Sequence, residues 1–155
     1  MPKFFSDPEA IAEQIVRDVG TELVVGLPLG LGKANHIVNA LYARAVADRS
    51  INLTLFSALT LEKPKPKSLL ERRFIGPVID RLFGGYPDLA YADALHRGAL
   101  PPNIKVIEFF FLAGQWLGNS YAQERYISAN YTHASSYLMT RGVNVIAQLV
   151  AKRVV

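Results

Sequence analysis

The residues best suited to hold a ligand follow the first short apolar run of the chain. Residues 23–25 lead into the glycine-rich segment Gly26-Leu-Pro-Leu-Gly-Leu-Gly32, and a helix is expected from about Lys33. Glycines let a ligand approach the backbone closely, and the first turn of a helix offers free amides to an anion. The segment therefore predicts a ligand site at the end of a strand. Its candidate binding residues are Gly26, Pro28, Gly30, Gly32, Lys33 and Asn35.

Two well-known phosphate-binding patterns do not fit this segment. A Walker loop has four residues between its first glycine and the Gly-Lys pair, whereas five separate Gly26 from Gly32-Lys33. Ala34 also stands where Ser or Thr would bind magnesium, and the dinucleotide pattern that begins at Gly30 would need Gly or Ala in place of Asn35. A tight strand-to-helix turn, followed by solvated polar residues, explains the glycines equally well.

A second polar cluster, Ser-Ala-Asn-Tyr-Thr-His over residues 128–133, lies between an apolar stub and an expected helix. Asn130 and His133 are its candidate ligand contacts. In the alternative interpretation, Thr132 caps the helix and His133 is a surface or packing residue. The residue types favour that alternative.

Candidates for acid–base or nucleophilic catalysis are weak. Glu108 is the only carboxylate inside an apolar run, and Lys105 would face the opposite side of the strand. We therefore expect Glu108 at a sheet edge or strand end and assign it no catalytic role. The chain has no cysteine, no Gly-x-Ser-x-Gly motif and only three widely spaced histidines, so neither a thiolate nucleophile nor a metal site is expected.

Composition and charge indicate one cytoplasmic α/β domain over residues 1–155. The net charge is +4, but the basic residues are dispersed, and the densest group alternates with prolines over 62–67, which is typical of a stiff linker. Nucleic acid is therefore not the expected partner. No apolar run approaches the roughly 20 residues of a membrane span, and the N-terminus does not resemble a signal peptide.

Apolar runs separated by helical stretches predict an open, mainly parallel sheet with helices on both faces, because parallel neighbours need long crossovers. Asp7-Pro8-Glu9 is a strong helix start. Helices are expected over 7–20, about 33–48, 120–125 and 134–140. Three further short helices are expected within 68–98, with breaks at Gly76-Pro77, Gly84-Gly85 and Pro87. The expected strands cover 23–25, 53–61, 104–111 and 144–150.

The order of these segments resembles the N-terminal half of the acetyl-CoA hydrolase/transferase family, the class I coenzyme A transferases. The resemblance rests on residues 23–34 with Leu41 in the next helix, on 51–61 and on 142–150, and it extends along nearly the whole chain. It implies an open α/β fold of the coenzyme A transferase type.

The resemblance also implies an acyl-CoA enzyme. In the family, a glutamate of the second half attacks the thioester, forms a glutamyl-CoA intermediate and passes CoA to a carboxylate or to water. Acyl-CoA and small carboxylates are then the partners, and no covalently bound cofactor is expected. The glycine-rich loop of the N-terminal half lies close to the acyl group, and Gly26, Pro28, Gly30 and Gly32 match it in position. Residues 130–133 fall where another loop faces the cleft, with different residue types.

Two departures from the family shape the expected activity. No glutamate of this chain matches the nucleophile, and the chain ends where the family continues into its second half. We therefore expect a truncated product that is inactive alone, with an exposed sheet edge at 144–150 that favours a homo-oligomer. The alternatives are a non-catalytic α/β ligand-binding or oligomerisation module, and a small nucleic-acid-binding domain that uses the Lys-Pro tract.

Overall fold

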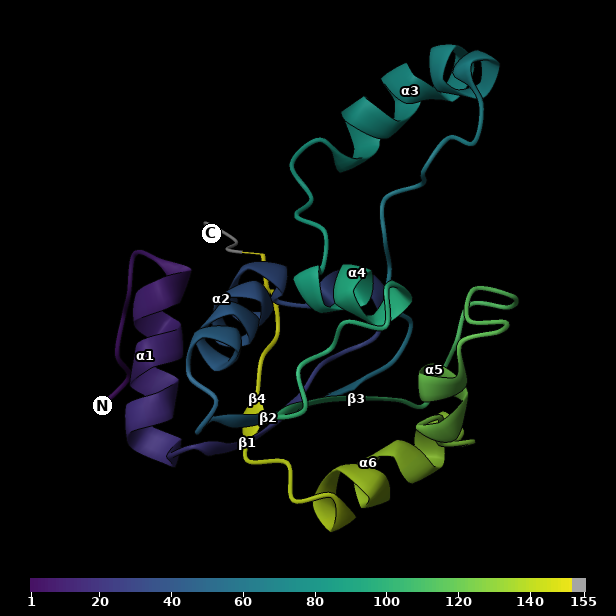
Figure 1. Cartoon of the computed structure of the whole chain (residues 1–155). Coiled ribbons are helices and arrows are strands. Elements are labelled where there is room, and N and C mark those ends of the chain that lie inside the picture. Colours follow the sequence, from purple (N-terminus) through teal and green to yellow (C-terminus); the bar gives the residue numbers. More distant parts are fainter. Residues whose placement is uncertain (152–155) are drawn as a thin grey trace.

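A four-stranded sheet with the strand order β3-β2-β1-β4 forms the centre of the molecule (Figure 1). The computed structural model describes residues 1–151. The strands are β1 (Glu22–Gly26), β2 (Asn52–Ser57), β3 (Ile104–Glu108) and β4 (Val145–Ile146). All three pairings between them are parallel. The predicted α/β architecture with a mainly parallel sheet is therefore confirmed.

The register of the sheet aligns the apolar residues that the sequence places in its strands. Leu23 is aligned with Leu53, and Leu53 with Ile104. Val145 of the short edge strand is aligned with Val25. The fully buried apolar residues of the three longer strands are Leu23, Val25, Leu53, Leu55, Phe56, Ile104 and Val106. Apart from Phe56 these residues alternate along their strands, so one face of the sheet is fully covered, whereas Val24 and Thr54 on the other face are half-buried and Lys105 is exposed.

Helices cover the sheet on two sides. They are α1 (Pro8–Val19), α2 (Asn35–Ala47), α4 (Ala90–His96), α5 (Ser120–Glu124) and α6 (Tyr131–Thr140), with a 3-10 turn, η1, at Gly30–Gly32. Figure 1 shows α2 and α4 on one side of the sheet and α6 on the other. The start of α1 is as predicted: the Asp7 carboxylate accepts a hydrogen bond from the Ala10 amide at 2.7 Å, and Pro8 is the first helical residue. No helix of residues 1–151 is long and apolar enough to cross a bilayer.

The strands are shorter than predicted at their carboxyl ends. The predicted strand over 53–61 ends at Ser57, because the chain turns there and Leu59 adopts a φ of 48°. The strand predicted over 104–111 ends at Glu108, and the one over 144–150 pairs only at Val145–Ile146. After β4 the chain bonds instead to the glycine-rich loop, where the Leu149 amide donates to the Gly32 carbonyl at 2.8 Å.

One long helix replaces the first of the short helices predicted from Ser68 onward, while the predicted breaks at Gly84-Gly85 and Pro87 are confirmed and the short helix α4 follows them. Helix α3 (Leu69–Phe83) continues through Gly76 and Pro77, so the predicted break there is wrong. A proline removes one hydrogen bond and bends the helix, and an exposed helix bends without disturbing any packing. None of the residues of α3 is buried, and Figure 1 shows it standing away from the sheet at the end of the 62–67 linker, which has no regular structure.

Candidate ligand site at the carboxyl edge of the sheet

The strand order reverses beside β1. The chain proceeds outward from β1 to β2 and β3, then returns through α5 and α6 to place β4 on the other side of β1. Open parallel sheets bind ligands outside the carboxyl ends of their strands at such a reversal. The glycine-rich loop, residues 26–32, begins at the carboxyl end of β1 and therefore lies at this point.

A small hollow of about 160 Å³ opens beside this loop. It is lined by Gly26, Leu27 and Pro28 from the loop, Leu138 from α6, and Ile146 and Gln148 from β4 and the segment after it. Five of these six residues present apolar atoms, and Gln148 adds one amide side chain. The loop therefore borders a hollow that is mainly apolar and open to a small group.

Gly26 lies where α6 and the segment before β4 close on the end of β1. A Cβ atom at this position would lie 3.1 Å from Cγ1 of Val143 and 3.2 Å from Cδ2 of Leu138. Those distances are tighter than ordinary van der Waals contacts, so a side chain would push both residues outward. Close packing therefore favours glycine at position 26, independently of any ligand.

Lys33 fixes the far end of the loop from inside the protein. Its side chain is 1% exposed, and Nζ donates to the carbonyls of Ala58 and, at 3.0 Å, Leu59. Burial lowers the Lys33 pKa to about 8, and the nearby Glu108 carboxylate opposes that change. The solvated first-turn position considered from the sequence is wrong for Lys33, because it is buried and turned toward the carbonyls that follow β2.

Glu108 ends β3, as expected, and is buried beside Lys33. It is 3% exposed, and Oε1 accepts hydrogen bonds from the Thr60 amide at 3.1 Å and from the Thr60 hydroxyl. The Thr60 hydroxyl is 2.9 Å from that of Tyr91. Burial raises the pKa of both Glu108 and Tyr91. We call this group of Lys33, Thr60, Tyr91 and Glu108 the buried polar cluster.

The buried polar cluster joins four segments, namely the chain after η1, the chain after β2, α4 and the end of β3, and none of its residues lines the hollow. Sequence reasoning missed Thr60 and Tyr91, because a lone Thr and a lone Tyr carry no pattern that separates them from ordinary surface residues. The available signal was a lysine directly after the glycine-rich loop and a glutamate inside the third apolar run, both expected near the carboxyl ends of parallel strands. Within the described residues, Oε2 of Glu108 and the Ser57 hydroxyl have no hydrogen-bond partner.

Asn35 is also turned inward. Its amide Nδ2 donates to the Pro87 carbonyl at 2.7 Å, and only about 3% of the residue is exposed. It therefore ties the start of α2 to the chain before α4 and was wrongly considered a solvated residue. His36, by contrast, is exposed in the first turn of α2.

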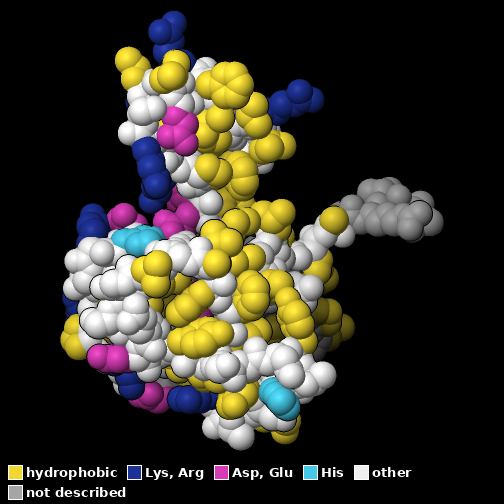
Figure 2. Space-filling model, turned by 90° about the vertical axis from the view of Figure 1, so that its right-hand side faces the viewer, with side chains coloured by type: hydrophobic (Ala, Val, Ile, Leu, Met, Phe, Trp, Pro, Cys, Tyr) yellow, Lys and Arg dark blue, Asp and Glu magenta, His cyan; other side chains and the backbone are white. Residues whose placement is uncertain are grey.

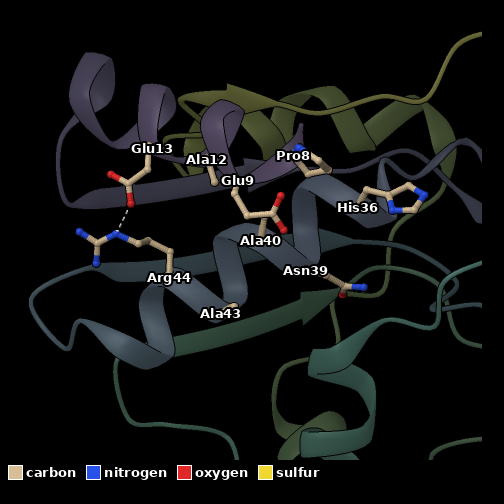
Figure 3. A pocket seen from close by; sticks show the side chains of 9 residues that line it. All are labelled: Pro8, Glu9, Ala12, Glu13, His36, Asn39, Ala40, Ala43 and Arg44. Carbon is tan, nitrogen blue, oxygen red and sulfur yellow. Dashed lines mark hydrogen bonds and ion pairs between the residues drawn. The ribbon is translucent and has the colours of Figure 1, made fainter. Parts of the chain in front are cut away.

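A second hollow lies in the groove between α1 and α2 (Figure 3). It measures about 360 Å³ and is lined by Pro8, Glu9, Ala12, Glu13, His36, Asn39, Ala40, Ala43 and Arg44. Small residues leave room between the helices, and the Glu13–Arg44 ion pair, 2.6 Å long, closes one end. This groove shares no residue with the glycine-rich loop.

The polar cluster over 128–133 begins α6. Asn130 is the cap: its side-chain oxygen accepts from the His133 amide at 3.2 Å and from the Thr132 hydroxyl at 2.6 Å. The alternative that made Thr132 the cap is therefore wrong. Asn130 borders a further hollow of about 250 Å³ with Phe109, Phe110, Ala129 and Tyr131, and neither it nor His133 lines the hollow beside the glycine-rich loop.

Comparisons with known proteins found no relative of this chain. No protein-family model, no curated protein and no solved structure matches the chain at a significant level. Among residues 1–151, no group of three or more histidine, aspartate or glutamate side chains is arranged to hold a metal ion.

Proposed function

We propose that this chain belongs to an acyl-CoA enzyme of the coenzyme A transferase type and that it binds the thioester end of acyl-CoA beside the glycine-rich loop. The observation that carries the proposal is the hollow at the strand-order reversal, walled by Gly26, Leu27 and Pro28. The family resemblance over residues 23–34 supports the same loop. A coenzyme A transferase-like arrangement of the parallel sheet is part of this proposal.

The size of the hollow limits which part of the ligand it takes. Pockets for drug-sized ligands measure about 300–1,000 Å³, and this hollow measures about 160 Å³. It therefore suits a small acyl group and its thioester, while the nucleotide part of CoA lies outside it. Leu27, Leu138 and Ile146 supply apolar contacts for the acyl carbon atoms, and Gln148 supplies a polar contact for the thioester oxygen.

The described residues supply binding and orientation but no covalent step. No glutamate lines the hollow, and Glu108 is buried behind Thr60 and Tyr91. A thioester held here has no carboxylate of residues 1–151 within reach to attack it. We therefore expect the chain to bind acetyl-CoA without consuming it.

Calorimetric titration with acetyl-CoA, CoA and a sugar phosphate tests the proposal. Gln148→Trp fills the hollow from an exposed position and should weaken acetyl-CoA binding at least about tenfold. Gln123→Trp, at an exposed position of α5 outside the hollow, should leave binding unchanged. Equal binding of the sugar phosphate, or acetyl-CoA binding that Gln148→Trp does not affect, would contradict the proposal. So would steady turnover of acetyl-CoA by the pure chain.

A further inference from the structure

Helix α3 carries a row of exposed apolar side chains that the rest of the chain leaves uncovered. Leu70, Phe74, Val78 and Leu82 follow one another at intervals of four residues, and Phe74 is 84% exposed. Residues four apart lie on the same face of a helix. Figure 2 shows hydrophobic side chains gathered along the part of the molecule that projects from the body. A helix face of this kind is normally packed against another surface.

The row is self-complementary. Leu70 and Leu82 lie six residues on either side of Gly76, and Phe74 and Val78 lie two residues on either side. If two copies of α3 packed antiparallel about a two-fold axis at the level of Gly76, Leu70 of each copy would lie at the level of Leu82 of the other. Phe74 would likewise lie at the level of Val78. Each apolar side chain would then meet an apolar partner.

The charges beside the row show the same symmetry. Glu71 and Arg81 lie five residues on either side of Gly76, and at about 100° per residue both lie on the helix face that carries the row. An antiparallel pair places Glu71 of each copy at the level of Arg81 of the other, twice in the interface. A parallel pair would instead place Glu71 at the level of Glu71, with no opposite charge there. The other charged residues of α3, Arg72, Arg73 and Asp80, lie on the opposite face.

We propose that α3 is the dimerisation element of this chain and that its occupant is the α3 helix of a second copy, packed antiparallel. A two-fold contact uses the same patch on both copies, and the pairing of the row and its charges meets that requirement. Within the described residues neither Glu71 nor Arg81 forms an ion pair, so both are free to pair across the contact. The inference does not depend on the bound ligand proposed above.

The size of the contact predicts its strength. Fifteen residues make a helix about 22 Å long. A single helix pair lies at the small end of specific interfaces, so we expect a dissociation constant in the micromolar range. The dimer should therefore form and dissociate over an accessible dilution series.

Sedimentation velocity at roughly 1 to 100 μM tests the contact. The wild-type chain should pass from monomer to dimer, and Phe74→Asp should weaken the dimer at least about tenfold. Leu117→Asp is the matched control, because Leu117 is 83% exposed and lies outside α3. A monomer at all concentrations would overturn the proposal, as would a dimer that is insensitive to Phe74→Asp or that is lost in Ile146→Asp on the β4 edge.

Charge reversal tests the antiparallel orientation. Arg81→Glu places two acidic side chains at one level and should weaken the dimer several-fold, and Glu71→Lys added to it should restore most of the affinity. Arg72→Glu, on the opposite face, is the control. The Glu71 carboxylate also accepts a hydrogen bond from the Lys67 amide at the start of the helix. Circular dichroism is therefore needed to show that each variant keeps its helix content. A double variant that keeps its helix content and does not recover would overturn the antiparallel pairing.

Discussion

At the residue scale, the carboxyl edge of the sheet is organised by one buried lysine. Lys33 reaches the carbonyls of Ala58 and Leu59, which the turn after β2 removes from the strand ladder. Buried carbonyls need hydrogen-bond donors, and a charged donor satisfies two of them at once. The glycine-rich loop is thereby held against the segment after β2.

Replacing this lysine by an apolar residue of similar length should therefore destabilise the fold. We expect Lys33→Met to lower the free energy of unfolding by about 2–4 kcal/mol, because two carbonyls lose a donor and Glu108 loses its nearby positive charge. Urea denaturation measures this loss. Lys63→Met, in the linker, should change stability by less than about 0.5 kcal/mol. Equal stability of both variants would mean that water satisfies the carbonyls.

The same lysine predicts how stability depends on pH. Its pKa is lowered from 10.5 to about 8 in the folded chain, so between these values the unfolded chain binds the extra proton and stability rises with pH. From pH 8 to 10 the rise should be roughly 2 kcal/mol. Tyr91 and Glu108 have raised pKa values in the folded chain, so each loses its contribution to stability as the pH rises. For Tyr91 this loss begins only near its ordinary pKa of 10.0, and for Glu108 it begins near 4.5.

Comparing the wild-type chain with Lys33→Met separates the pH dependence caused by the lysine from that caused by Tyr91 and Glu108. The variant should lack the rise in stability between pH 8 and 10 and should keep the remaining pH dependence. Urea denaturation of both chains at several pH values measures the difference. Parallel pH profiles would show that burial of Lys33 does not shift its titration.

At the element scale, the sequence predicts the elements better than their ends. The cap at Asp7 and the apolar runs at Leu23, Leu53 and Val106 are local signals, and each element they predict is present. The ends of β2 and β4 depend on contacts with the glycine-rich loop, which local residue types do not encode. The long α3 was missed because Gly76-Pro77 breaks most helices that are held in a core.

For the candidate site, too, the sequence predicts the local element but not the contacts between distant residues. The sequence places a glycine-rich loop after the first strand, and the structure has it there beside a hollow. The sequence does not indicate that the side chains of Lys33 and Asn35 turn inward, because their hydrogen-bond partners, Leu59 and Pro87, are distant along the chain.

The closure of α6 on β1 gives a prediction at this scale. Gly26→Ala should lower the free energy of unfolding by about 1–3 kcal/mol, because the added methyl group meets Val143 and Leu138 at 3.1 and 3.2 Å. Gly85→Ala, where a Cβ atom meets nothing within 4 Å, is the control and should change stability little. If the two variants unfold at the same urea concentration, the packing of α6 on β1 is looser than described.

At the scale of the whole molecule, the sheet and α3 present two separate candidate binding surfaces. The sheet carries the hollow at its strand-order reversal, and α3 carries an apolar row away from it. The edge strand β4 also exposes Ile146, and Leu149 and Val150 beyond it are exposed. Self-association through this edge, expected from the sequence, stays a prediction that competes with the contact through α3.

We propose that the hollow beside the glycine-rich loop holds the acyl end of a CoA thioester. A methyl NMR titration of the whole chain with acetyl-CoA tests it most directly. We predict saturable shifts of the methyl groups of Leu27, Leu138 and Ile146, with unchanged signals from Ala12, Ala40 and Ala43 in the groove between α1 and α2. Shifts confined to that groove, or no saturable shift at Leu138 and Ile146, would contradict the claim.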